Sequence, residues 1–168
     1  MIKSVIKGYG YYVPENVVTN DDLSKLMTTN DEWITERTGI KERRHRKNRN
    51  DSEETTAFLA KKAAEKALEK ANLTAKDLDF IVFATLSPDY FFPGSGVVLQ
   101  EMLGCDTIGA LDVRNQCSGF VYSMSVADAF IKAGTYKNIL VVGAEVHSFG
   151  LDFTDDGRGV SVIFGDGA

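Results

Sequence analysis

The sequence predicts an α/β domain with a mostly parallel sheet flanked by helices. Strand-like and helix-like segments alternate along the 168 residues, and this order is typical of α/β folds. Residues 78–86 and 138–144 are almost continuously apolar, as in parallel strands that are covered on both faces. In such sheets ligands bind beyond the carboxyl ends of the strands, so we look for a site there.

The amino-terminal part predicts one strand and two short helices. Residues 3–13 read as a strand in which Gly8 and Gly10 are points of close approach to another segment. Residues with N-cap side chains predict a helix over 19–27 and a second helix over 29–39, which ends at a glycine.

The rest of the chain alternates regularly. Residues 52–71 carry a broad apolar face rich in alanine, which predicts a helix packed closely against another element. The elements expected after it are a strand at 78–86, a helix at 96–103, a strand at 108–113, a helix at 118–133 and a strand at 138–144. Residues 160–164 fit a strand and a buried helix equally well, because short apolar runs do not decide.

Composition excludes several classes of protein. The net charge of −5 does not suggest a nucleic-acid binder, and the apolar and charged fractions are ordinary for a globular chain. Two cysteines without a C-x-x-C pair predict neither a disulfide framework nor a metal site. We find no apolar run of membrane-spanning length and no signal peptide, so we expect a cytoplasmic protein without a membrane partner.

Cys117 is the first candidate for chemistry. It lies between the expected strand at 108–113 and the expected helix at 118–133. Free N–H groups and the dipole at a helix start favour negative charge, and therefore a nucleophilic thiolate. Gly119 would let a substrate approach the backbone closely. The alternative is a cysteine buried as a small apolar core residue.

Six segments together resemble the beta-ketoacyl-acyl-carrier-protein synthase III family, a branch of the thiolase-fold condensing enzymes. They are residues 8–15, 30–34, 37–40, 117–120, 141–145 and 164–168. They occur in family order and nearly cover the chain. The resemblance implies a thiolase-like fold, with residues 1–168 as its N-terminal half domain. We expect that half domain to be incomplete, with one further strand and the family's catalytic histidine and asparagine after Ala168.

The resemblance also implies a reaction. Cys117 would accept an acyl group from acyl-CoA as a thioester and condense it with malonyl-acyl-carrier protein with decarboxylation, which initiates fatty acid synthesis. A thiolate suits this role because it is both a nucleophile and a leaving group. Backbone N–H groups beside it would form part of an oxyanion hole. Acyl-CoA is then a substrate, no cofactor is needed, and the protein is expected to be a homodimer.

Five further residues match functional positions of the family. Trp33, Arg37 and Arg158 match residues that contact CoA, where an indole and guanidinium groups suit adenine and phosphate. Thr29 matches a position near the same coenzyme, although it is also a plausible helix cap. Phe92 matches a residue that lines the acyl pocket of the partner subunit. The alternatives are core packing for Trp33 and Phe92 and ordinary solvated surface for the arginines.

The chain departs from the family pattern before the nucleophile and after the strand at 138–144. Arg114, Asn115 and Gln116 stand where many relatives carry small apolar residues. Residues 147–152 diverge as well. The acyl preference is therefore open, and a related thiolase-fold acyltransferase of specialised metabolism or a catalytically incomplete fragment remain alternatives.

The basic run at 41–49 and the two histidines give less specific indications of function. The basic run at 41–49 reads as an exposed loop, which would meet an acidic carrier protein or CoA phosphates, or simply be solvated. His45 lies in this run and is expected at the surface. His147 follows the strand at 138–144 but does not match the family's histidine motif, so neither histidine is assigned as a base.

Overall fold

The computed structural model describes residues 2–47 and 53–168. They form two compact units: the first unit comprises residues 1–12, 55–145 and 168, and the second unit comprises residues 13–54 and 146–167. The elements in chain order are β1 (Val17–Thr19), α1 (Asn20–Ser24), α2 (Asp31–Thr38), β2 (Glu42–Arg44), α3 (Thr56–Ala71), η1 (Ala75–Asp77), β3 (Phe80–Ala84), α4 (Ser95–Leu103), β4 (Gly109–Val113), η2 (Gln116–Ser118), α5 (Gly119–Lys132), β5 (Ile139–Gly143) and α6 (Arg158–Ser161).

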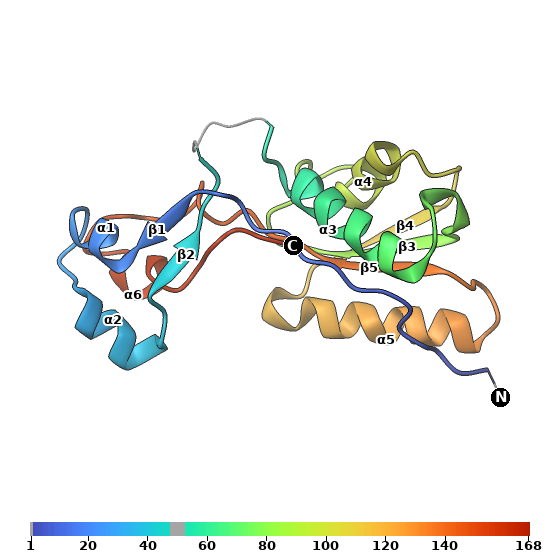
Figure 1. Cartoon of the computed structure of the whole chain (residues 1–168), viewed down its shortest axis with the longest axis horizontal. Helices are drawn as coiled ribbons and strands as arrows, with labels where there is room; N and C mark the ends of the chain where they lie inside the picture. Colours follow the sequence, from blue (N-terminus) through green and yellow to red (C-terminus); the bar gives the residue numbers. More distant parts are fainter. Residues whose placement is uncertain (1, 48–52) are drawn as a thin grey trace. The chain divides into compact units, whose positions relative to one another are not determined.

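The first unit is built on a three-stranded parallel sheet. The strand order is β4-β3-β5, and Ala84 at the end of β3 lies opposite Val113 of β4 and Gly143 of β5. Helices α3 and α4 cover one face of the sheet and α5 covers the other (Figure 1). The predicted parallel sheet flanked by helices is therefore confirmed, and each predicted element after residue 78 forms within a few residues of its expected bounds.

Burial of β3 defines the core of this unit. All five of its residues are buried, and Ile81, Val82 and Phe83 are fully inaccessible. Ile81 and Phe83 pack with buried apolar side chains of α3, α4 and β5 in one cluster. The continuous apolar run at 78–86 therefore predicted a strand covered on both faces correctly.

The strand predicted at 3–13 is wrong. These residues have no regular secondary structure, because a strand needs a partner for its N–H and C=O groups. Within the described chain, the backbone pair in this segment is that of Tyr12 with Ala168, which exchange two 2.9 Å hydrogen bonds. The predicted close approach is confirmed: Cβ atoms at Gly8 and Gly10 would collide with backbone oxygens of α3.

Helix α3 begins later than predicted. Thr55 is its N-cap, with a hydroxyl that accepts a 3.2 Å hydrogen bond from the N–H of Phe58. Glu53 and Glu54 precede the helix, and Ser52 lies outside the described residues. The apolar face rich in alanine is buried as expected, and its small side chains let the glycine segment lie directly on the helix.

Helix α5 packs through its smallest residues. Gly119, Ser123 and Ala127 are its buried residues, spaced four apart on one face. Large apolar side chains, among them Val121 and Tyr122, are more than half exposed. Small residues allow a helix to approach a sheet closely, and the large apolar side chains of α5 are left at the surface.

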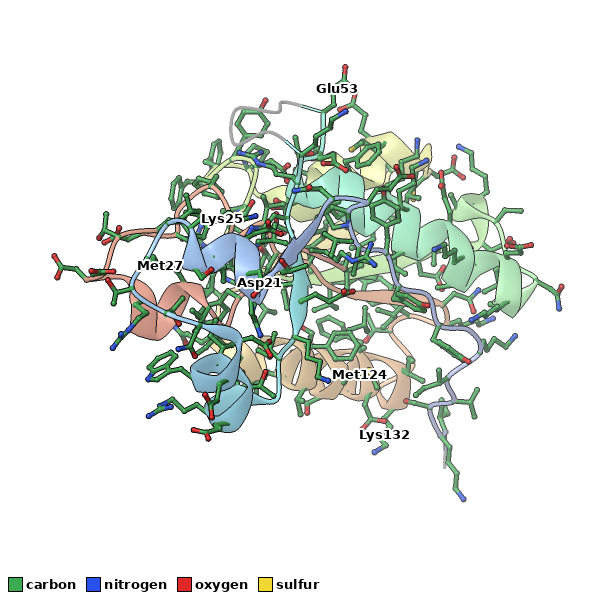
Figure 2. The ribbon with its side chains drawn as sticks, turned by 60° about the vertical axis from the view of Figure 1, so that its left-hand side comes forward. Asp21, Lys25, Met27, Glu53, Met124 and Lys132 are labelled. Carbon is green, nitrogen blue, oxygen red and sulfur yellow. The ribbon has the colours of Figure 1, made fainter. Side chains whose placement is uncertain are left out.

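The second unit combines a two-stranded antiparallel ribbon with three short helices. β1 pairs with β2, and Val18 lies opposite Arg43. A capping box of Thr19 and Asp22 starts α1; Figure 2 labels Asp21 on this helix and Lys25, its C-cap. Asn30 caps α2, which ends at Gly39 with a φ of 73°. Both predicted helices are therefore confirmed.

The basic run at 41–49 is not simply an exposed loop. β2 occupies its first part, and Arg43 and His45 are only 5% and 6% exposed. The expectation that His45 lies at the surface is therefore wrong. Asn48 and Arg49 lie outside the described residues. The region left open at 160–164 contains the end of α6 rather than a strand. None of the described helices combines the length and apolar character needed to cross a membrane.

The contact between Gly10 and α3 generates a prediction about stability. Gly10→Val should lower the free energy of unfolding by about 1–3 kcal/mol, because its Cβ would collide with the carbonyl oxygen of Ala63. Chemical denaturation measures this change. Gly159→Ala is the control, since its Cβ would meet no atom within 4 Å. Equal stability of Gly10→Val and wild type would contradict the proposed packing.

Candidate functional site

Cys117 lies in an exposed turn at the start of α5. It occupies the middle of η2, which follows β4 and directly precedes α5. Its predicted place between a strand and a helix is therefore confirmed, and the alternative of a buried core residue is wrong. The other cysteine, Cys105, is half-buried beside the core. Burial raises the pKa of the Cys105 thiol, which disfavours its thiolate.

The turn that contains Cys117 has an unusual backbone. Gln116 has a φ of 36°, in the left-handed region that costs a residue other than glycine about 1–3 kcal/mol. The side-chain amide of Asn115 donates a 2.9 Å hydrogen bond to the Ser118 hydroxyl and so spans the turn. Asn115 and Gln116 therefore shape the turn that contains Cys117.

Gly119 packs against the central strand of the sheet. It is buried, and a Cβ there would lie 3.3 Å from the Cβ of Ala84 at the end of β3. This distance is tighter than ordinary van der Waals contact. The glycine therefore lets α5 begin directly against the central strand, which fixes where the helix start and the preceding turn with Cys117 lie.

Phe92 is not a core residue. It is 91% exposed, and its neighbour Phe91 is 86% exposed. The guanidinium carbon of Arg114 lies 4.7 Å from the centre of the Phe91 ring, a cation–π contact. Arg114, three residues before Cys117, therefore touches the segment that carries Phe92.

Two carboxylates that the sequence did not single out hold the segment before α4. Glu145, after β5, accepts hydrogen bonds from the N–H groups of Leu86 and Ser87 at 2.8 and 3.0 Å. Asp112, inside β4, accepts from the N–H groups of Ser95 and Gly96 at 2.7 and 2.9 Å. The sequence signal for Asp112 was an acidic residue within an apolar strand, because a carboxylate that is even half-buried needs hydrogen-bond donors.

Trp33, Arg37 and Arg158 come together in the second unit, and we call them the Trp33 cluster. The guanidinium carbons of Arg37 and Arg158 lie 4.5 and 4.6 Å from the centre of the indole ring. Arg37 is one turn after Trp33 on α2, whereas Arg158 comes from α6. Trp33 is half-buried and also packs against the core that contains Ile34. One part of its side chain therefore contributes to the core, and the other part is exposed beside the two arginines.

Asp155 and Arg158 hold the segment before α2. The side chain of Arg158 donates a 2.7 Å hydrogen bond to the carbonyl oxygen of Thr28, and the hydroxyl of Thr28 donates one of 2.7 Å to Asp155. Hydrogen bonds from the N–H and hydroxyl of Thr28 lower the pKa of the Asp155 carboxyl, and Arg158 lowers it further. These contacts fix a cationic group beside the indole of Trp33.

Thr29 has a hydroxyl that no described residue uses. Asn30 caps α2 instead, accepting a 2.8 Å hydrogen bond from the N–H of Trp33. The Thr29 hydroxyl is buried and lacks a hydrogen-bond partner in the described chain. It belongs to a surface depression lined by residues 24–29 and 154–156. A buried hydroxyl left without a partner is unfavourable.

Both histidines belong to the second unit. The Nε2 atom of His45 lies 3.2 Å from the carbonyl oxygen of Phe164, and its ring centre lies 5.9 Å from that of Phe153. His147 is half-buried with its ring centre 4.9 Å from that of Phe164. Each imidazole therefore packs on aromatic rings of its own unit.

Comparisons with known proteins identify the family. The family model described as 3-oxoacyl-[acyl-carrier-protein] synthase III matches residues 111–168. A beta-ketoacyl-[acyl-carrier-protein] synthase III from Aquifex aeolicus (strain VF5) is 48% identical over 163 residues, which cover 97% of this chain and 50% of that protein. The chain belongs to the 3-oxoacyl-[acyl-carrier-protein] synthase III family.

Solved structures of relatives share this fold. The crystal structure of a synthase III from Aquifex aeolicus VF5 is similar with a TM-score of 0.91 at 47% identity, over 99% of this chain and 51% of that one. A priming beta-ketosynthase from the R1128 polyketide biosynthetic pathway gives a TM-score of 0.89 at 31% identity, over 96% and 47%. The predicted thiolase-like fold is confirmed, and the chain spans about half the length of the curated relatives it matches.

The hydrogen bonds of Asp155 predict an acid-dependent contact in this synthase III chain. A carboxyl whose pKa is lowered by folding contributes stability above its ordinary pKa of about 3.9, and loses that contribution as the pH falls through the folded value. Thr28→Val removes one of the donors, so the pKa of Asp155 should rise part of the way to its ordinary value. Carboxyl titration by NMR measures it, and an unchanged value would contradict the assignment.

Proposed function

We propose that this chain is the cysteine-bearing part of a cytoplasmic condensing enzyme that initiates fatty acid synthesis. Cys117 accepts an acyl group from acyl-CoA, which is a substrate and not a cofactor, and the acyl group is then joined to malonyl-acyl-carrier protein. The observation that carries the proposal is the exposed cysteine in a constrained turn at the start of α5, in a chain of the synthase III family.

The proposed first step is a thioester exchange at Cys117. Its thiolate attacks the acyl carbonyl carbon of acyl-CoA, the new carbon–sulfur bond forms, and the bond to the CoA sulfur breaks. CoA leaves as a thiolate and takes up a proton. The position at a helix start favours the negative charge of the attacking sulfur, and exposure gives the acyl donor access.

The proposed second step needs more than Cys117. Malonyl-acyl-carrier protein loses carbon dioxide, its carbanion attacks the acyl carbonyl carbon, and the bond to the Cys117 sulfur breaks. We propose that the histidine and asparagine of the family, which assist this step, follow Ala168 in the full protein. The aromatic packing of His45 and His147 supports leaving both out of the catalytic set.

The Trp33 cluster supports a role in CoA recognition. It combines a flat aromatic ring with two guanidinium groups, which suit an adenine ring and phosphates respectively. Both arginines already lie over the indole, so an adenine that stacks between Trp33 and one of them replaces one cation–π contact. The unused hydroxyl of Thr29 supplies a further polar contact.

Exposed apolar side chains support a homodimer. Phe91 and Phe92 are almost fully exposed, and α5 exposes large apolar side chains. Patches of this kind mark surfaces that bind other protein. We propose that Phe92 of one subunit lines the acyl pocket of its partner, as the family resemblance implies.

A second candidate function is acyl transfer in specialised metabolism. Arg114, Asn115 and Gln116 shape the cysteine turn with polar side chains. One similar structure belongs to a polyketide pathway according to its own description. A product assay that offers malonyl-carrier protein, malonyl-CoA or a second acyl-CoA as extender separates the two functions.

The acylation step predicts a single labelled residue. Radiolabelled acyl-CoA offered to the full protein should leave its label on Cys117, and Cys117→Ala should lose it almost completely because no nucleophile remains. Cys105→Ala is the matched control, since burial disfavours its thiolate, and it should label normally. Peptide mapping by mass spectrometry locates the label. Full labelling of Cys117→Ala would refute the proposed nucleophile.

The division of the catalytic groups predicts how residues 1–168 behave alone. They should form no condensation product, because the proposed histidine and asparagine are not supplied, while slow acylation of Cys117 survives. Liquid chromatography with mass spectrometry detects both species. Condensation by this stretch alone would contradict the proposal that the remaining catalytic groups follow Ala168.

A further inference from the structure

The second unit buries an arginine for which the proposed reaction has no use. Arg43 on β2 is 5% exposed, and it forms no ion pair with any residue in the described ranges. Burial lowers the pKa of its guanidinium. Removing a cation from water is costly unless its hydrogen-bond donors are satisfied. The hydrogen-bond acceptors of Arg43 therefore indicate which structural role its burial serves.

Those partners belong to three different elements. One terminal nitrogen of Arg43 donates hydrogen bonds to the side-chain oxygen of Asn20 at 2.7 Å and to the carbonyl oxygen of Val162 at 2.9 Å. The other donates to the carbonyl oxygen of Val18 at 3.2 Å. The guanidinium therefore links β1, the start of α1 and the residue that directly follows α6.

Asn20 extends this link to α2. It is 1% exposed, and its side-chain nitrogen donates to a carboxylate oxygen of Asp31 at 2.7 Å and to the carbonyl oxygen of Ile40 at 2.8 Å. Asp31 is the first residue of α2, and Ile40 follows its glycine cap. One buried amide thus holds both ends of the helix.

The chain of contacts from Asp31 through Asn20 and Arg43 to the Val162 carbonyl is here called the Arg43 relay. It joins α2, which carries Trp33 and Arg37, to α6, which carries Arg158. We propose that Arg43 is a positioning residue for coenzyme recognition, which holds the Trp33 cluster together by fixing α2 and α6 through this relay. The inference rests on the proposed CoA-binding role of that cluster.

An arginine is required by the geometry of the relay. A guanidinium presents five donors in a rigid planar fork, whereas a lysine ammonium is a compact, strongly hydrated charge. Arg43→Lys keeps the charge but cannot reach acceptors on three elements together. A purely structural role would cost stability without altering the contacts of Trp33, so the test needs a direct signal from that indole.

The experiment compares two variants of the relay with matched neighbours in the full protein. Arg43→Lys is paired with Arg44→Lys, because Arg44 lies beside it on β2 and its side chain makes 3.4 Å contacts outside the relay and a 3.7 Å ion pair. Asp31→Ala is paired with Glu32→Ala, since both carboxylates are exposed in the first turn of α2. Because Asp31 is exposed, Asp31→Ala disturbs less packing than Arg43→Lys, and Asn20 keeps its hydrogen bond to the carbonyl oxygen of Ile40.

Two signals are measured for each protein. Calorimetry gives the Kd for CoA, and fluorine NMR of protein labelled with 5-fluorotryptophan gives the resonance of Trp33, assigned with Trp33→Phe. Both relay variants should weaken CoA binding by about tenfold, as expected for losing one or two charge-assisted hydrogen bonds. Both should also shift or broaden the Trp33 signal, whereas Arg44→Lys and Glu32→Ala should match wild type.

The outcomes separate this inference from the proposed function. A folded Asp31→Ala variant with wild-type Kd and an unchanged Trp33 signal overturns the positioning role of the relay. A wild-type protein that does not bind CoA refutes the coenzyme role of the cluster. In that case a displaced Trp33 signal in the unliganded relay variants still supports the positioning of the indole, and an unchanged signal refutes it.

Discussion

Strand β3 is the constraint on which the first unit depends. Its five residues are buried, and it pairs in parallel on both sides. Parallel pairing brings the ends of β4 and β5 to the same edge as Ala84. The turn that contains Cys117 follows β4 at that edge, and Glu145 follows β5. The exposed cysteine is thus placed by a strand that contributes no reactive group.

The close approach of α5 to β3 completes this placement. Gly119 lies against Ala84 with no room for an ordinary side chain, so the helix start and the turn before it have little freedom. Asp112 and Glu145 then fix the neighbouring segment through backbone N–H groups. Cys117 is exposed, yet its surroundings are fixed by the packing of α5 and by hydrogen bonds from backbone N–H groups to two carboxylates.

Local signals in the sequence predicted most elements. The apolar run of β3 and the caps of α2 at Asn30 and Gly39 depend on neighbouring residues alone, so they could be read directly. The strand predicted at 3–13 was wrong because a strand forms only beside a hydrogen-bonded partner strand, and the tertiary fold decides which segments become neighbours. The predicted exposure of the basic run was wrong for Arg43 and His45. Their polar side chains indicated a surface position, whereas their hydrogen-bond partners are residues far along the chain.

The site shows the same division. Trp33 and Arg37 are one helical turn apart, so their contact follows from helix periodicity. Arg158 joins them only through the tertiary fold, and the family resemblance was needed to associate it with Trp33. The sequence indicates for Asn20 only a position in the capped start of the helix predicted over 19–27. Its hydrogen bonds to both ends of α2 depend on the tertiary fold and leave no pattern in the neighbouring sequence.

The second unit is discontinuous, and this bears on when it can form during synthesis. Its first segment, residues 13–54, leaves the ribosome long before residues 146–167. The carbonyl of Val162 is 119 positions later than Arg43, and domains fold as their parts are synthesised. The guanidinium therefore stays hydrated while the whole parallel sheet is translated. Within residues 1–168, the contacts around Trp33 are therefore completed only after the strand that leads to Cys117 has been made.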